Sequence, residues 1–163
     1  MNEYGNLLNF SYTCKPLSYG KDIFTLLKRR NIKSYLQKPK NKRFHYIIKF
    51  DEVIILSKIE FENRIDSNFR YYISLEENGE QITLDNERYA CSGGLKTIYF
   101  HFLPCKYVHF ITSNNQQLPE KKFIECYGFH KNNFREKYGE EMLRMIYHKT
   151  SQIIYQDNKN LLI

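Results

Sequence analysis

The sequence has few cysteines and no long apolar run, and these shortages exclude several classes of protein. No apolar stretch approaches the roughly 20 residues that a membrane-spanning helix needs. The four cysteines are isolated, without the paired spacing of a structural zinc site, and no apolar signal-peptide run opens the chain. We therefore expect an intracellular protein with reduced thiols, no metal site and no membrane segment.

Catalytic motifs are missing as well. Phosphate-binding glycine loops, serine-hydrolase elbows, zinc-protease motifs and dinucleotide fingerprints do not occur. The five histidines are scattered, and His101 and His109 fall in predicted strands, where a hydrogen-bonded or solvent-facing histidine is the usual finding. Glu60 and Glu62 alternate at the end of a strand but lack a third cation ligand at matching spacing. We predict a protein that is not an enzyme and needs no cofactor.

The chain is rich in tyrosine, phenylalanine and positive charge. Fourteen tyrosines and 12 phenylalanines supply all of its aromatic residues, and 42% of its 163 residues are hydrophobic, enough for one self-sufficient core. Lysine and arginine exceed aspartate and glutamate by seven (25 − 18). Eight basic residues and no acidic one fall in the segment Lys28–Arg43, which is expected to attract an acidic partner.

From Tyr46 onward, β-branched and aromatic residues dominate short runs that turn residues separate at near-regular intervals. This pattern predicts about eight antiparallel strands and hence an all-β sandwich. Alternation places Val53, Ile55, Ile59 and Phe61 on one strand face, and Ile98, Phe100 and Phe102 on another. The expected strands are Leu7–Cys14, Tyr46–Phe50, Val53–Phe61, Arg70–Glu76, Gln81–Leu84, Leu95–Phe102, Tyr107–Thr112 and Lys122–Tyr127.

Turn and helix signals complete the prediction. Asn78-Gly79 predicts a tight hairpin, and Lys15-Pro16 is expected to end the first strand because proline cannot donate to a ladder. Asp22–Arg30 is expected to form one or two helical turns. After Gly128 the apolar residues recur at three- and four-residue steps, which predicts a helix with Gly139 as a weak point. This helix either covers the sandwich of residues 1–129 or docks to a partner, as part of a segment 130–163 that ends in a docking tail.

Three stretches resemble a known family. They are Ser11–Gly20 with its Cys14-Lys15-Pro16, Asn31–Phe50, and Lys106–Tyr127 with its loop Ser113-Asn114-Asn115-Gln116-Gln117. Together they resemble the DOC domain, the substrate-recruiting subunit of the anaphase-promoting complex, within the discoidin/F5/8 type C, galactose-binding-like superfamily. The resemblance spans roughly Ser11 to Phe129 and implies a jelly-roll β-sandwich.

The chain departs from the family pattern in three places. Leu36 stands where the family usually has tryptophan, and Asn115 stands where it has a loop histidine. The family's C-terminal tail ends in isoleucine-arginine and docks into a tetratricopeptide-repeat subunit, whereas this chain ends in Leu161-Leu162-Ile163. An apolar tail with a free carboxylate is still expected to dock, but the arginine contact does not carry over.

The resemblance implies a non-catalytic degron co-receptor in the nucleus and cytoplasm. Its partners would be the tetratricopeptide-repeat and cullin-like scaffold subunits, an activator protein and degron-bearing substrates. The alternative is an intracellular adaptor that binds nucleic acid or an acidic protein surface through Lys28–Arg43; a sugar-binding lectin is a third reading, by fold analogy alone. The expected substrate-binding residues are Tyr35, Gln37, Arg64, Asp66, Asn114, Asn115 and Gln116, and the expected partner-docking residues are Leu161, Leu162 and Ile163.

Overall fold

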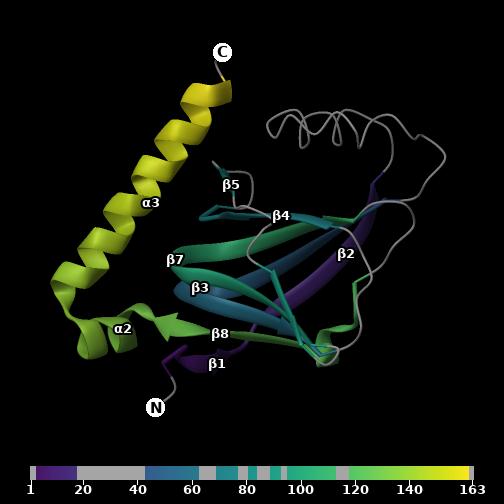
Figure 1. Ribbon diagram of the computed structural model, residues 1–163, viewed down its shortest axis with the longest axis horizontal. Helices are drawn as coiled ribbons and strands as arrows, with labels where there is room; N and C mark the ends of the chain where they lie inside the picture. The colour runs from purple at the N-terminus through teal and green to yellow at the C-terminus, as the bar shows by residue number, and fades with distance from the viewer. Residues whose placement is uncertain are drawn as a thin grey trace.

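The computed structural model describes residues 3–17, 43–62, 69–76, 81–83, 89–92, 95–112 and 118–161. Most of these residues lie in antiparallel strands, and two helices follow the last strand (Figure 1), so the predicted all-β fold with a C-terminal helical segment is confirmed. The elements are β1 (Asn6–Leu8), β2 (Ser11–Leu17), β3 (Arg43–Phe61), β4 (Phe69–Ser74), β5 (Gln81–Thr83), β6 (Tyr89–Ser92), β7 (Leu95–Thr112), a 3-10 turn (Lys121–Phe123), β8 (Ile124–His130), α2 (Lys131–Tyr138) and α3 (Glu140–Leu161).

Two long strands, β3 and β7, pair with each other in two ladders and organise the fold. Residues 45–49 of β3 pair with residues 107–111 of β7, and residues 54–61 pair with residues 96–105. Between these ladders β3 has four residues, 50–53, opposite Lys106 alone. Extra residues on one strand bend a ladder. The four predicted strands in these regions are therefore two bent strands.

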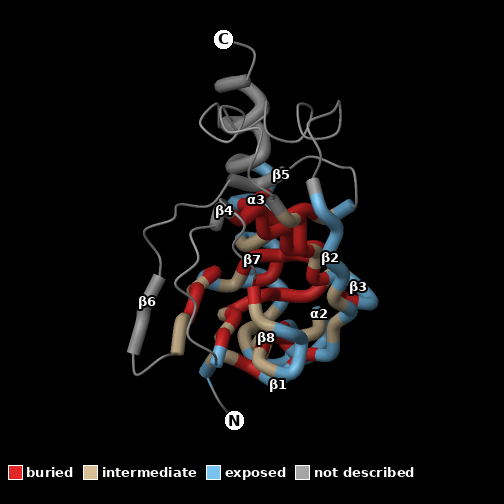
Figure 2. The backbone as a smooth tube through the Cα atoms, turned by 90° about the vertical axis from the view of Figure 1, so that its right-hand side faces the viewer, coloured by how far each residue is buried: buried red, intermediate tan, exposed pale blue. Residues whose placement is uncertain are grey.

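The bend divides the sheet into two layers. The first contains β2, residues 43–50 of β3, residues 107–112 of β7, β4 and β5. The second contains β1, β8, residues 54–61 of β3, residues 95–105 of β7, and β6. Rings from the two layers meet, with Phe61 5.6 Å from Phe110 and Tyr71 5.8 Å from Phe100 between centroids. This is the sandwich core, and buried residues gather in the middle of the molecule (Figure 2).

The prediction from simple alternation placed some residues of β3 and β7 on the wrong face of the sheet. Ile59 and Phe61 face the core between the layers, but Ile55 packs in a second cluster on the outer face, and Val53 is only half-buried. The register shift between Leu56 and Lys58 separates them, because a bulge moves every later side chain to the other side of the strand.

The same correction applies to Phe102. Ile98 and Phe100 face the core between the layers, whereas Phe102 packs with the outer cluster. His101 and Phe102 adopt φ values of 54° and 60°, and residues 100–102 of β7 oppose Ser57 alone. Two successive left-handed residues turn the Phe102 ring outward, where it lies 6.0 Å from the ring of Phe129.

The outer cluster holds the helices against the second layer. Phe134 of α2 is fully buried, and its ring lies 5.7 Å from both Phe102 and Phe129 and 4.8 Å from Tyr138. Leu143 adds an apolar side chain from α3. The helical segment therefore packs on its own sandwich through apolar side chains. This contact is what the first of the two predicted roles, covering the sandwich, requires.

The edges of the sheet bring one correction and one confirmation. The first predicted strand is two strands, and Pro16 continues β2 opposite Phe44 instead of ending it. Proline is accommodated because β2 is an edge strand that pairs, among the described residues, with β3 alone. The predicted hairpin is confirmed by the pairing of Ile73 with Ile82, although Asn78-Gly79 lies outside the described residues, as does the predicted helix Asp22–Arg30.

Gly139 divides the predicted single helix into two. It has φ 93° and ψ 163°, its backbone N–H bonds Arg135 O at 2.8 Å to end α2, and its carbonyl accepts the N–H of Leu143 in α3. This backbone region is accessible essentially to glycine alone.

Gly139→Ala is therefore expected to lower the free energy of unfolding by about 2 kcal/mol. In an uninterrupted helix the same change would raise it by about 1 kcal/mol. No atom lies within 4 Å of the added Cβ, so backbone strain is the cause. Urea denaturation measures the effect, with Lys149→Ala on α3 as the helical control. A stabilised Gly139→Ala variant would mean that the two helices are continuous.

Candidate functional site

The segments that contain the predicted substrate-binding residues are all flanked by described residues at one end of the first layer. Leu17 at the end of β2 pairs with Arg43 at the start of β3. Thr112 at the end of β7 pairs with Phe69 at the start of β4, and its Oγ1 accepts the N–H of Phe44 at 3.1 Å. Segments 18–42, 63–68 and 113–117 therefore each have at least one flank at this end, which we call the loop end.

A group of aromatic side chains on β2 and β3 lies near the loop end. The Tyr12 and Tyr46 rings stack at 5.6 Å, and the Tyr12 hydroxyl donates to Pro119 O at 3.1 Å, just after segment 113–117. Burial raises the pKa of Tyr12 well above its ordinary value and raises that of Tyr46 to about 12. Both phenols therefore stay protonated at neutral pH.

None of the predicted site residues is itself placed. Tyr35, Gln37, Arg64, Asp66, Asn114, Asn115 and Gln116 all lie outside the described residues, as do Leu162 and Ile163. Leu161 is the last residue of α3, and its side chain is not described. These assignments stay predictions.

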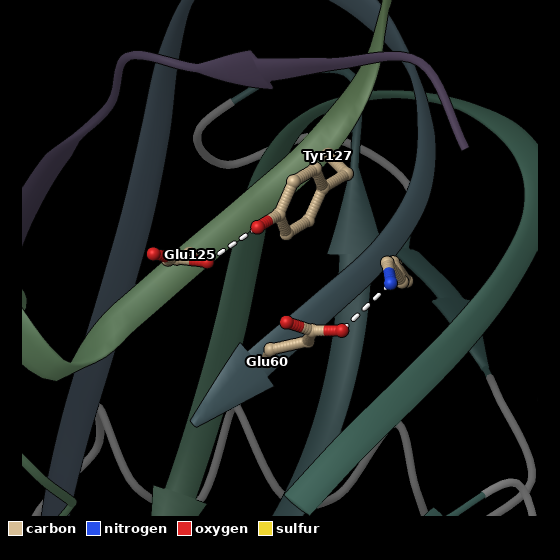
Figure 3. A network of polar contacts seen from close by, with 4 residues as sticks. Glu60, Glu125 and Tyr127 are labelled. Carbon is tan, nitrogen blue, oxygen red and sulfur yellow. Dashed lines mark hydrogen bonds and ion pairs between the residues drawn. The ribbon is translucent and has the colours of Figure 1, made fainter. Parts of the chain in front are cut away.

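A polar and aromatic cluster that sequence reasoning missed lies on the outer face of the second layer (Figure 3). Two rows of register partners cross β7, β3 and β8: Tyr99, Lys58 and Tyr127, then Thr97, Glu60 and Glu125. The intervening row, Ile98, Ile59 and Cys126, faces the core, so the polar rows point outward. We call Tyr4, Lys58, Glu60, Tyr99, Glu125 and Tyr127 the outer-face cluster.

The contacts inside the outer-face cluster are close. The Lys58 Nζ lies 2.6 Å from Glu60 Oε1, 4.3 Å from the centroid of the Tyr4 ring and 4.9 Å from that of Tyr127. The Tyr127 hydroxyl donates to Glu125 Oε2 (Figure 3), and this bond, with burial and the neighbouring carboxylates, raises the pKa of Tyr127. The signal for this cluster was the alternation of polar residues at 58 and 60 and at 125 and 127.

A second missed group lies buried on the outer face of the first layer. His45 Nε2 and His109 Nδ1 are 2.9 Å apart, and the other ring nitrogen of His109 lies 3.2 Å from Ser74 Oγ. Tyr72 stacks on the His109 ring with 4.4 Å between centroids. Burial and the nearby Lys15 lower the pKa of His45 to about 4. The prediction of a hydrogen-bonded or exposed histidine holds for His109, which is bonded, and for His101, which is exposed.

Ser74 and His109 have the atoms that a nucleophile and its base need, but neither residue is accessible to a substrate. Ser74 is 1% exposed and His109 3% exposed, so a substrate carbonyl has no approach to the hydroxyl oxygen. Cys14, Cys105 and Cys126 are free thiols, and burial raises the pKa of Cys105 and Cys126. Within the described ranges, no group of three or more histidine, cysteine, aspartate or glutamate residues could hold a metal ion.

Comparisons with known proteins return structures only. A scan against protein-family models and a search of curated proteins both find no match. The chain is similar in fold to the CBM32-3 module of a family 31 glycoside hydrolase from Clostridium perfringens, at 18% identity and TM-score 0.39, covering 56% of this chain and 70% of that one.

Two further solved structures are similar to this chain. The CBM32-1 and CBM32-2 domains of Clostridium perfringens ZmpB show 16% identity and TM-score 0.42, covering 94% of this chain and 48% of that one. A fucose-binding module from Streptococcus pneumoniae shows 12% identity and TM-score 0.38, covering 80% and 99%. No helix in the described part of the chain is long and apolar enough to cross a membrane.

Proposed function

We propose that the chain is a non-catalytic recognition subunit of the DOC type, which holds degron-bearing substrates for the anaphase-promoting complex. The observation that carries this proposal is the common placement of strand ends at the loop end. The β2 end, the β3 start, the β7 end and the β4 start lie together there, at the flanks of all three predicted binding segments. Loops on a rigid β scaffold are where recognition concentrates in proteins.

The chemistry of the predicted residues suits an extended peptide. Asn114, Asn115 and Gln116 each offer both hydrogen-bond donors and acceptors to a peptide backbone. Arg64 and Asp66 would read a charged side chain. In this proposal the aromatic group beneath the loop end keeps the flanks of the segments fixed, so that less entropy is lost when a peptide binds.

The proposed partners divide between the two ends of the chain. The loop end would face an activator protein and the substrate, in the nucleus and cytoplasm. The tail Leu161-Leu162-Ile163 would dock its apolar side chains into a tetratricopeptide-repeat scaffold subunit. The helical segment itself packs on the sandwich through Phe134, so docking is assigned to the tail and not to the inner face of α2.

Affinity purification from the protein's own cells tests this function, with the tag at the N-terminus so that the tail stays free. Cullin-like, RING and tetratricopeptide-repeat subunits are expected to co-purify. Deleting residues 161–163 is expected to reduce their recovery at least tenfold. A triple Asn114→Ala, Asn115→Ala, Gln116→Ala variant is expected to keep these subunits but lose the substrate, because only the loop contacts are removed.

Asn133→Ala, an exposed amide on α2, is the matched control and should behave like the unmodified protein. Recovery of none of the scaffold subunits would remove the proposal. Recovery of nucleic acid that falls steeply as salt rises would instead favour the alternative, an adaptor that binds through the eight basic residues of Lys28–Arg43.

A further inference from the structure

The outer-face cluster has an excess of negative charge on a basic protein. Glu60 and Glu125 are direct register partners on neighbouring strands, an arrangement of like charges that destabilises a sheet. Glu62 adds a third carboxylate near Tyr127. Glu60 is paired with Lys58, whereas Glu125 accepts the neutral hydroxyl of Tyr127, so the carboxylates of the outer-face cluster outnumber its one lysine.

Lys58 shows what kind of group the cluster accommodates. Its ammonium lies over both the Tyr4 and the Tyr127 ring, at 4.3 and 4.9 Å from their centroids, with Glu60 as its counter-ion. Rings around an ammonium are the arrangement by which proteins recognise cationic ligands. The Lys58 and Glu60 side chains are 13% and 16% exposed, so the ammonium is largely withdrawn from water.

The cluster offers further acceptor capacity beside the cage. Glu60 bonds to Lys58 through Oε1 and Glu125 accepts from Tyr127 through Oε2, which leaves a second oxygen on each carboxylate. The sign of the charge excludes an anion, and the donor set excludes a metal ion within the described residues. An organic cation satisfies both the rings and the carboxylates, because it bonds to oxygen through N–H groups and lies against aromatic faces.

We propose that Tyr4, Tyr127, Glu60 and Glu125 form a cation-binding cage for a lysine or arginine side chain of a partner, and that Lys58 occupies it in the free protein. The partner's cation exchanges with Lys58, whose long stem carries the released ammonium to water. Binding to the unmodified protein is then weak, because the exchange replaces one cation by another. This site lies on the outer face of the second layer and does not depend on the function proposed for the loop end.

Titration with capped single amino acids, followed by nuclear magnetic resonance of the backbone amides, tests the cage. N-acetyl-lysine amide and N-acetyl-arginine amide are the cationic probes, and N-acetyl-citrulline amide is the uncharged one. Lys58→Met is expected to bind a cationic probe at least tenfold more tightly than the unmodified protein, since the internal competitor is gone. The lysine and arginine arms distinguish an ammonium from a guanidinium ligand.

Glu60→Gln and Glu125→Gln, each made in the Lys58→Met background, are expected to reduce that affinity at least tenfold. Lys149→Met and Glu136→Gln are matched controls at exposed helix positions and should change nothing. Equal binding of citrulline and arginine, or no gain in Lys58→Met, would overturn the proposal. If Lys58→Met does not fold, Lys58→Arg replaces it. The Lys58→Arg variant keeps an internal cation, so it should bind the cationic probes no more tightly than the unmodified protein. In the unmodified protein, Glu125→Gln alone should weaken the binding of N-acetyl-arginine amide.

Discussion

Replacing Phe134 by alanine is expected to lower the free energy of unfolding by about 3–5 kcal/mol. The Phe134 ring is fully buried and touches the rings of Phe102, Phe129 and Tyr138. Its removal leaves a cavity between α2 and the second layer, and that interface consists largely of aromatic rings that cannot collapse into the space. Guanidinium denaturation followed by circular dichroism measures the change.

Met145→Ala is the matched control, because Met145 on α3 is 62% exposed and its truncation should alter stability by no more than about 0.5 kcal/mol. Phe134→Leu should fall between the two. If the helices detach while the sandwich stays folded, the helical and β signals will melt separately. A Phe134→Ala variant as stable as Met145→Ala would contradict the packing described for the outer cluster.

Acid is expected to destabilise the protein through His45. Burial and the charge of Lys15 lower the pKa of its imidazole from 6.5 to about 4, so the unfolded chain binds the proton more readily than the folded one. The stability that this difference supplies is fully present above about pH 6.5 and is lost as the pH falls towards 4. Between about pH 7.5 and about pH 5 the loss amounts to about 2 kcal/mol.

The hydrogen bond between His45 and His109 adds to the effect. One imidazole donates and the other accepts at 2.9 Å, so protonating both rings would set two N–H groups against each other. Urea denaturation across this pH range checks the expectation. His45→Gln should flatten the pH dependence whatever it does to stability at neutral pH. His101→Asn, at an exposed position, should leave it unchanged. An unmodified protein equally stable at both ends of the range would refute this reading.

Much of the fold follows from local patterns, and the errors have local physical causes. Runs of β-branched and aromatic residues predict strands because the pleat alone sets their period. The alternation failed at Ile55 and Phe102, where a bulge reverses the facing of the later residues. No residue type at Ser57 or His101 announces such a bulge. Only the pairing of β3 with both β7 and β8 fixes where the extra residues go.

The candidate sites divide in the same way. The loop residues from Tyr35 to Gln116 came from a family resemblance, and the structure adds the common end at which their flanks lie. The alternation of polar residues at 58 and 60 and at 125 and 127 was the only sign of the outer-face cluster in the sequence, because Tyr4, Lys58, Tyr99 and Tyr127 come from four separate segments. Lys58, Tyr99 and Tyr127 are brought together by the register of β3, β7 and β8, and Tyr4, which precedes β1, adds its ring to them.

The sequence alone determined the all-β class, the hairpin of β4 and β5 and the helical ending, because these depend on local period and turn chemistry. The tertiary structure alone decided the bend of β3 and β7 into two layers, the break at Gly139, the buried pairing of His45 with His109 and the cage around Lys58. Those features depend on contacts between residues far apart in the chain, whose closure is favoured only by the whole core and not by any one segment.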